Sequence, residues 1–231
     1  MSDPITTMRA RIAEIGRLMY ERHLTDAAGG NISARVSDGV NDVICVTPRY
    51  AGSKHQWRLR PENVIVADLN GNKLEGEGEI SREAKVHFKL LTEFPAGRAV
   101  VHGHPRHVMV FAMAGRPIVP VLENTLKFGV IKVCRFAPAH SVELPEYIAA
   151  ELRGQEAAIQ KQAAAVIAPW HGLFVLGKDL ESAYDAAERI DVNAHCILMS
   201  RLLPGAPVDP EAIHAQLRSV VSSQSSVASR Q

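Results

Sequence analysis

The sequence predicts an α/β fold in which helices cover a mixed or antiparallel sheet. Helical patterns stand at both ends of the chain, and strand and hairpin patterns fill the region between them. No regular alternation of strand and helix appears, and no Gly-rich fingerprint follows a first strand, which argues against a Rossmann domain. The 231 residues fit one domain with a substantial core.

Helices are predicted where apolar residues recur at helical spacing. Ser2 and Asp3 offer capping side chains before Pro4, so the first helix is expected to begin there and to end near His23. Pro105 is expected at the first position of another helix. The remaining predicted helices are one opened by residues 81–83, residues 106–114, residues 144–152, a long helix that starts at residue 179 or 181, and residues 210–221.

Strands are predicted where short apolar, β-branched runs are bounded by turn residues. The predicted strands are residues 43–47, 63–68, 99–101, 117–122, 129–133, 164–168 and 173–176. The sequence Asn70-Gly71-Asn72 predicts a hairpin turn after the second of these. Residues 1–204 are expected to form the main domain, and residues 205–231 a peripheral helix and a flexible tail that is rich in serine from residue 222.

Charge and composition exclude several classes of partner. The formal net charge of +1 gives no reason to expect nucleic acid or an anionic membrane surface as a partner. No apolar run approaches the ~20 residues of a membrane span, and no basic segment followed by an apolar core marks a signal peptide. Cys45, Cys134 and Cys196 lack metal-binding spacing, which predicts reduced thiols in a cytoplasmic protein.

Three histidines stand where predicted strands end. His102 and His104 are two residues apart, so in an extended backbone their side chains point to the same side and can reach one metal ion. His171 follows the predicted strand 164–168 and supplies a third imidazole. Three protein ligands with one open position are typical of a catalytic metal site. The alternative is a pair of surface imidazoles at His102 and His104.

Other candidate residues carry weaker signals. Glu83 falls in the first turn of a predicted helix, where a carboxylate is usually only favourable with the helix dipole. Gly30 and Asn31 belong to a Gly-rich segment that either brings backbone N–H groups close to a ligand or forms an ordinary turn before a strand. His107 either supports the metal ligands or is merely packed.

The order of these short motifs resembles the class II aldolase/adducin family over roughly residues 5–203. The motifs are Gly-Gly-Asn-Ile-Ser at 29–33, Thr-Pro at 47–48, Ser-Arg-Glu at 81–83, His-Gly-His at 102–104 and His-Gly at 171–172. The resemblance implies a three-layer α/β/α sandwich with a central mixed, largely antiparallel sheet, and a homotetramer with active sites near subunit interfaces.

The same resemblance implies roles for individual residues. The family's three metal-binding histidines fall on His102, His104 and His171, and its acid/base glutamate falls on Glu83. One divalent cation per subunit is expected, Mn²⁺ or Zn²⁺, because three histidines with open positions do not select one metal.

Two departures from the family pattern bear on the substrate. Sugar-phosphate aldolases of the family hold phosphate with a Thr-Pro-Thr-Gly turn and a Ser-Ser pair, whereas this chain has Arg49 and Tyr50 in the turn and Ser81 followed by Arg82. Tyr50 would crowd a phosphate nest, while two guanidinium groups suit carboxylates and a tyrosine ring suits a flat substrate. Either arginine could instead lie in solvent. The predicted substrate-binding residues are Gly30, Asn31, Arg49, Tyr50, Ser81 and Arg82.

These observations favour a metal-dependent carbon–carbon lyase that decarboxylates a small hydroxy-aromatic or hydroxy-pyridine dicarboxylate. The alternative is an aldolase or epimerase that acts on a small sugar or sugar phosphate, where the same metal would stabilise an enediolate. A third hypothesis is a non-catalytic, adducin-like head for protein association. The sequence disfavours it because the three histidines and the glutamate are all present.

Overall fold

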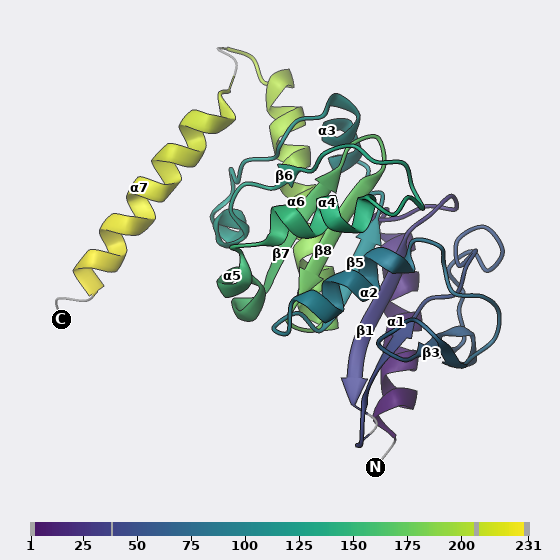
Figure 1. Cartoon of the computed structure of the whole chain (residues 1–231). Helices are drawn as coiled ribbons and strands as arrows, with labels where there is room; N and C mark the ends of the chain where they lie inside the picture. The colour runs from purple at the N-terminus through teal and green to yellow at the C-terminus, as the bar shows by residue number, and fades with distance from the viewer. Residues whose placement is uncertain (1–2, 38, 206–207, 229–231) are drawn as a thin grey trace.

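A single eight-stranded sheet runs through the computed structural model, which describes residues 3–37, 39–205 and 208–228 (Figure 1). Within those residues the strand order is β4-β3-β2-β1-β5-β8-β7-β6, and every pair is antiparallel except β6 with β7. The strands are β1 Asn31–Ser37, β2 Asp42–Val46, β3 Ile65–Ala67, β4 Lys73–Glu75, β5 Ala99–Gly103, β6 Lys132–Val133, β7 Ala163–Ala168 and β8 Gly172–Gly177. The predicted mixed, largely antiparallel sheet is confirmed.

Helices cover both faces of the sheet. Helices α1, α3 and α6 pack on one face, and α2, α4 and α5 pack on the other. The α-helices are α1 Pro4–Glu21, α2 Ala84–Glu93, α3 Val108–Ala114, α4 Leu144–Leu152, α5 Glu156–Lys161, α6 Leu180–Met199 and α7 Pro210–Ala228. Short 3-10 helices cover Pro61–Asn63, Glu123–Phe128 and Ser200–Leu202. This three-layer arrangement confirms the predicted sandwich.

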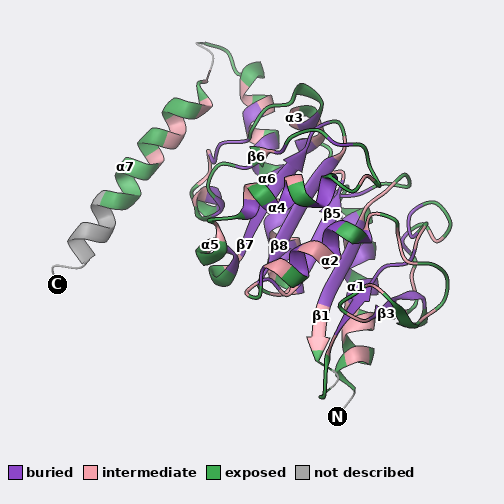
Figure 2. Ribbon diagram, viewed as in Figure 1, coloured by how far each residue is buried: buried purple, intermediate pink, exposed green. Residues whose placement is uncertain are grey.

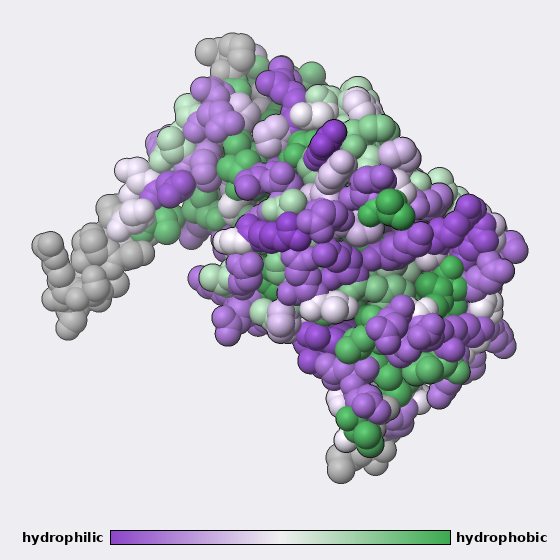
Figure 3. All heavy atoms as spheres, viewed as in Figure 1, coloured by the Kyte–Doolittle hydropathy of each residue, from purple (hydrophilic) through white to green (hydrophobic). Residues whose placement is uncertain are grey.

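The core divides into two apolar layers, one on each face of the sheet. In β7, Ala165 and Ile167 pack toward α6, whereas Ala164 and Val166 pack toward α4. Successive side chains of a strand point to opposite faces, so a strand buried on both faces is apolar throughout. Figure 2 shows the central strands buried along their length, while the outer surfaces of the helices are exposed. In the view of Figure 3, hydrophilic residues are interspersed with smaller hydrophobic groups.

The long helices begin at the capping residues that the sequence indicates. The Asp3 carboxylate accepts the N–H of Thr6 at 2.9 Å at the start of α1, and Asp179 accepts the N–H of Ser182 at 2.7 Å at the start of α6. These side chains satisfy amides that have no partner inside the helix. The suggested cap at Ser2 lies outside the described residues.

The predicted start of α3 is wrong. Pro105 is not at the first helical position, because α3 begins only at Val108. The buried Asp191 of α6 accepts the backbone N–H groups of His107 at 2.9 Å and Val108 at 3.1 Å. A side chain from a distant helix therefore caps α3, which the local sequence could not indicate.

The predicted strand at residues 117–122 is also wrong. It contributes only an isolated bridge between Ile118 and Ile131, and the predicted strand 129–133 shortens to β6. The side chain of Asn193 takes the place of a strand partner, since it donates to the Val119 carbonyl and accepts the N–H of Val121, both at 2.8 Å. The helices at Glu123–Phe128 and Glu156–Lys161 were not predicted.

The C-terminal segment is more helical than predicted. Helix α7 continues to Ala228 through the serine-rich residues expected to form a flexible tail. The segment after Pro210 contains no Gly or Pro, so nothing in it breaks a helix strongly. Helix α7 stands apart from the sheet in Figure 1, and His214 donates to the Pro120 carbonyl at 3.0 Å. The division between residues 204 and 205 stays a prediction, and Ala206 and Pro207 lie outside the described residues.

Within the described ranges, no helix has both the length and the apolar character that a membrane span requires.

Candidate metal centre and active-site cleft

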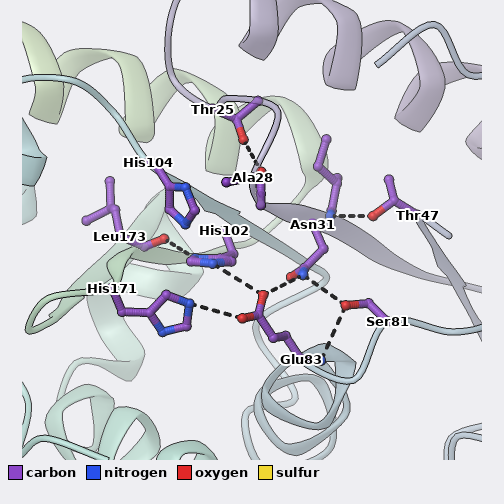
Figure 4. A network of polar contacts seen from close by, with 12 residues as sticks. Thr25, Ala28, Asn31, Thr47, Ser81, Glu83, His102, His104, His171 and Leu173 are labelled. Carbon is purple, nitrogen blue, oxygen red and sulfur yellow. Dashed lines mark hydrogen bonds and ion pairs between the residues drawn. The ribbon is translucent and has the colours of Figure 1, made fainter. Parts of the chain in front are cut away.

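Three neighbouring strands place the candidate residues at the same end of the sheet, where β5 ends and β1 and β8 begin. Asn31 at the start of β1 pairs with His102 near the end of β5, and Gly103 pairs with Leu173 of β8. Because β1 and β8 both run antiparallel to β5, the start of each lies beside the end of β5. His171 immediately precedes β8, so it also lies at this end of the sheet (Figure 4).

The three histidines converge. One ring nitrogen from each of His102, His104 and His171 lies within 4.8 Å of the others. His102 is fully buried, and the side chains of His104 and His171 are 14% and 15% exposed. The structure therefore brings together the side chains that the strand pattern predicted to meet.

Each histidine presents a buried nitrogen that makes no hydrogen bond within the described part of the chain: Nε2 of His102, Nε2 of His104 and Nδ1 of His171. Leaving such nitrogens unpaired costs free energy, which a bound cation removes. Imidazole suits Zn²⁺, Mn²⁺, Fe²⁺ and Co²⁺, and no cysteine takes part. The cluster therefore fits a divalent metal ion.

Two of these rings are oriented by contacts at their other nitrogen. His102 Nδ1–H donates to the Leu173 carbonyl at 2.9 Å, and His104 Nδ1–H donates to the Asp26 carboxylate at 3.2 Å. Such contacts fix the tautomer and aim the free Nε2 lone pair, as is usual for metal-binding histidines. Burial lowers the pKa of His102, with a smaller contribution from the charge of His171, so its ring stays neutral.

The carboxylate of Glu83 faces the histidines. Its Oε1 lies 3.1 Å from His171 Nε2, and its Oε2 lies 3.6 Å from His102 Nε2 (Figure 4). Burial by itself raises the pKa of Glu83, but the hydrogen bonds that its carboxylate accepts from His171 and Asn31 hold that pKa below its ordinary value. Glu83 is therefore ionised at neutral pH.

Glu83 is the residue immediately before α2 and makes no capping hydrogen bond with its side chain. Helix α2 therefore begins at Ala84, after the residues 81–83 that were predicted to open it, and Glu83 is its N-cap residue instead of part of its first turn. The interpretation of Glu83 as a partner of the helix dipole is disfavoured, because its carboxylate points toward the histidines.

Hydrogen bonds from Asn31 and to Ser81 fix the position of Glu83. Asn31 Nδ2 donates to Glu83 Oε2 at 3.1 Å and to Ser81 Oγ at 3.3 Å. Gly30 has a φ of +103°, and an added Cβ would lie 3.0 Å from the His102 carbonyl oxygen. Only glycine adopts this conformation readily, and only glycine leaves room for the His102 carbonyl oxygen.

The histidines open onto a cleft of about 330 Å³. Most of the predicted site residues line this cleft. They are Gly30, Asn31, Arg49, Tyr50, Ser81, Arg82, Glu83, His104 and His171. His102 is not among the lining residues, since its side chain is fully buried. The structure thus brings these residues to one cavity, while their roles stay predictions.

Arg49 and Tyr50 form one wall of the cleft. Arg49 Nη1 lies 2.9 Å from Glu79 Oε2 in a partly exposed ion pair. The Tyr50 ring has the Arg49 guanidinium 4.5 Å and the Lys54 ammonium 4.6 Å from its centroid. Tyr50 has a φ of +66°, a left-handed conformation that normally favours glycine. Arg82 is exposed at the cleft.

Sequence reasoning missed two residues of the site. Asp26 orients His104, and its other carboxylate oxygen accepts the N–H groups of Ala28 at 2.7 Å and Gly29 at 3.1 Å. Its signal was an acidic residue just before the Gly-rich turn, a position typical of an Asx turn. His140 also lines the cleft, and no sequence pattern indicates this.

His107 packs against α6. Its Nδ1–H donates to Asp191 Oδ2 at 2.7 Å, and its Nε2 lies 3.0 Å from Nδ1 of His195. Of the two interpretations of His107 that the sequence left open, these contacts favour a packed residue that helps to anchor the start of α3.

Substitution of Gly172 by alanine is expected to disrupt the histidine cluster. The added Cβ would lie 2.6 Å from the Gly103 carbonyl oxygen, 2.8 Å from His104 Cδ2 and 3.0 Å from His102 Cε1. Two rings and the β5 backbone must shift to accommodate it. We expect zinc to bind Gly172→Ala at least about 10-fold more weakly than the unchanged protein, as measured by calorimetry. Unchanged affinity would contradict the close packing around Gly172.

His87 gives stability a specific pH dependence. The ring is completely buried in α2, and burial lowers its pKa from 6.5 to about 3. The unfolded chain therefore takes up a proton below pH 6.5 that the folded chain excludes, and stability falls as pH falls. We expect the free energy of unfolding to fall more steeply in the unchanged protein than in His87→Asn, by about 1.4 kcal/mol per pH unit between about pH 6 and 4. Denaturant titrations at several pH values measure both slopes; equal slopes would rule out a neutral His87.

Residues 10–198 match the family described as Class II Aldolase and Adducin N-terminal domain. An L-fuculose phosphate aldolase of Methanococcus maripaludis is 29% identical over 181 residues, which cover 77% of this chain and 89% of that protein. A 3-oxo-tetronate 4-phosphate decarboxylase of Haemophilus influenzae is 28% identical over 192 residues, which cover 79% of this chain and 83% of that protein.

A solved structure shares the fold. An L-fuculose 1-phosphate aldolase superposes with a TM-score of 0.73 at 20% identity, over 92% of this chain and 96% of that one. The family match spans most of the chain and both layers of helices. The chain therefore belongs to the class II aldolase and adducin N-terminal domain family, an enzyme superfamily that contains aldolases and a decarboxylase.

Proposed function

We propose that this protein is a divalent-metal-dependent carbon–carbon lyase that decarboxylates a hydroxy-aromatic or hydroxy-pyridine dicarboxylate. The observation that carries the substrate class is the wall of the cleft formed by Arg49 and Tyr50. A bulky ring occupies a left-handed position that favours glycine, and a guanidinium lies against that ring. A flat, anionic substrate fits such a wall better than a phosphate that needs a nest of small residues.

A divalent cation held by His102, His104 and His171 would supply Lewis-acid stabilisation of the negative charge that develops on an oxygen beside the broken bond. We propose Mn²⁺ or Zn²⁺, one ion per subunit. The fit of the three unpaired nitrogens supports this part of the proposal.

The arginines bind and orient the substrate in this proposal. A guanidinium binds a carboxylate through two parallel hydrogen bonds, so Arg49 or Arg82 anchors the carboxylate that is retained. Arg49 is paired with Glu79, but an exposed ion pair contributes only ~0–1 kcal/mol, so a substrate carboxylate can replace it. The Tyr50 ring packs on the flat face of the substrate.

Glu83 handles the proton. Because it is ionised at neutral pH, it accepts the proton of the substrate hydroxyl on binding. The bond from the ring carbon to the departing carboxylate then breaks, CO₂ leaves, and the electron pair stays on the ring. Glu83, or a water that it holds, returns a proton to that ring carbon. The hydroxyl oxygen regains its proton from solvent as the product leaves.

A second candidate function is aldol cleavage or epimerisation of a small sugar or sugar phosphate. It is favoured by the similarity to an L-fuculose phosphate aldolase over most of both chains. The two arginines could bind a phosphate in place of a carboxylate. In this candidate Glu83 would accept a proton from a sugar hydroxyl or carbon.

One assay separates the two functions. Protein loaded with Mn²⁺ or Zn²⁺ is given 3-hydroxy-2-methylpyridine-4,5-dicarboxylate or a hydroxyphthalate, and CO₂ release is measured; L-fuculose 1-phosphate serves as the probe for aldol cleavage. We expect CO₂ release and no cleavage of the sugar. Absence of CO₂ from every ortho-hydroxy dicarboxylate, together with ready cleavage of the sugar phosphate, would overturn the proposal.

Arg82→Met tests the role of the guanidinium. Loss of a charge-assisted bidentate contact is expected to raise KM for the dicarboxylate by about 10-fold or more. Arg58→Met is the matched control, since Arg58 is exposed and does not line the cleft. An unchanged KM in Arg82→Met would place that side chain in solvent.

We further propose a cytoplasmic homotetramer with the cleft near a subunit interface. Light scattering on the purified protein measures the assembly, and a monomer would contradict this part of the proposal.

A further inference from the structure

In the described part of the chain, side chains of β1 make one hydrogen bond with the residue just before α2 and one with α2 itself. The first is the contact of Asn31 with Glu83, which belongs to the site already described. The second joins Ser33 Oγ to Nδ1 of His87 at 2.7 Å. No part of the proposed chemistry uses this second pair.

The two contacts lie side by side between the same face of β1 and the same side of α2. Asn31 and Ser33 are two residues apart in a strand, so their side chains point to the same face of the sheet. Glu83, the N-cap residue of α2, has a helical backbone conformation with φ −81° and ψ −10°, and His87 follows it by four residues. The two side chains therefore lie on the same side of α2. Movement of α2 relative to β1 therefore changes both contacts together.

Ser33 provides a fixed anchor. It lies in the interior of the sheet, paired with Val46 of β2 on one side and Val100 of β5 on the other. Both Ser33 and His87 have no exposed surface, so water does not compete for the hydrogen bond. The His87 ring also stays neutral at physiological pH because burial lowers its pKa to about 3, so the contact persists across that range.

The apolar contacts of α2 do not fix its rotation in the same way. Val86 and Leu90 pack in the apolar layer between α2 and the sheet. Apolar burial is not directional, whereas a hydrogen bond requires a defined distance and angle. The Ser33–His87 pair is thus a buried, directional contact one helical turn from Glu83.

We propose that Ser33 and His87 are positioning residues that set the rotation of α2 and so hold the Glu83 carboxylate against the histidine cluster. This inference rests on the proposed acid–base role of Glu83. It assigns to His87 a function in the site although His87 is neither a member of the histidine cluster nor among the residues that line the cleft.

Ser33→Ala removes the contact and leaves all the cleft-lining side chains unchanged. We expect kcat to fall by about 10-fold to 100-fold with KM within about threefold, because a misplacement of about 1 Å costs rates of this order. The protein should still bind one Zn²⁺ per chain. Ser200→Ala is the control, because it removes a serine-to-backbone hydrogen bond at the end of α6. Its kcat should change by less than about twofold.

A matched pair at His87 distinguishes positioning from simple packing. Asparagine places a polar atom where Nδ1 lies and glutamine places one near Nε2, so only His87→Asn can keep the contact with Ser33. We expect His87→Asn to retain at least about fivefold more kcat than His87→Gln, although asparagine leaves the larger cavity. Equal losses, or a greater loss in His87→Asn, would overturn the proposal.

A crystal structure of Ser33→Ala supplies a readout that needs no substrate. We expect the 3.1 Å contact of Glu83 with His171 to lengthen beyond hydrogen-bond distance. If that contact stays unchanged, the positioning role is refuted even where kcat falls. If the unchanged protein turns over none of the probes, the proposed function fails, while the crystal structures still decide whether Ser33 and His87 place Glu83.

Discussion

Replacement of Glu83 by glutamine is expected to lower kcat by about 100-fold to 10,000-fold, which is the range for loss of a general acid–base group. Glutamine keeps the shape of the side chain and can still accept the hydrogen bond from Asn31. It cannot accept the substrate proton or return it to carbon. Steady-state assays of CO₂ release measure the effect.

Two further measurements show whether the loss of activity in Glu83→Gln comes from loss of the proton carrier. Bound metal should stay at one ion per chain, because the three histidines are unchanged. Glu181→Gln is the matched control: it makes the same chemical change in an exposed carboxylate that contacts Arg11, away from the cleft. A Glu83→Gln enzyme within about threefold of the parent kcat would exclude Glu83 as the proton carrier.

Substitution of His104 by alanine is expected to abolish activity through loss of the metal. His104 contributes one of three converging imidazoles, and a change in a partner that merely orients a ligand already costs about 10-fold to 100-fold in affinity. Loss of the ligand itself should therefore weaken zinc binding by more than about 100-fold. Calorimetry with Zn²⁺ and elemental analysis of the purified protein measure this.

His140→Ala is the control for metal binding, because His140 lines the same cleft but is not part of the histidine cluster. It should retain one bound ion per chain. Removal of metal from the unchanged protein with a chelator should reproduce the inactivity of His104→Ala, and added Mn²⁺ or Zn²⁺ should restore activity only to the unchanged protein. Full metal occupancy in His104→Ala would refute the assignment of this ligand.

Local sequence patterns were informative wherever local geometry decided the outcome. Asp179 capped α6 as its position indicated, and helix α4 covers the residues that its apolar spacing predicted. The alternation of strand side chains placed His102 and His104 on one side. The order of short motifs then led to the family, which the match over residues 10–198 establishes.

Errors arose where a distant side chain satisfied the backbone. The start of α3 was mispredicted because Asp191 caps it from 84 residues away in sequence. The region 117–122 was predicted as a strand because it is apolar, but Asn193 of α6 occupies the hydrogen-bonding positions that a neighbouring strand would take. Such contacts leave no mark on the short windows from which helices and strands are predicted.

The sequence by itself determined strands β2, β3, β5, β7 and β8, most of the long helices, and the capped starts of α1 and α6. It also indicated which three imidazoles and which carboxylate could act together. Only the tertiary structure decided that Asp26 orients His104 and that Asn31 and Ser81 hold Glu83. It alone also placed Arg49 beside Glu79 and the Tyr50 ring. The reason is physical: spacing along the chain fixes where neighbouring side chains point, whereas contacts between residues tens of positions apart depend on strand order and register, which the whole core sets together.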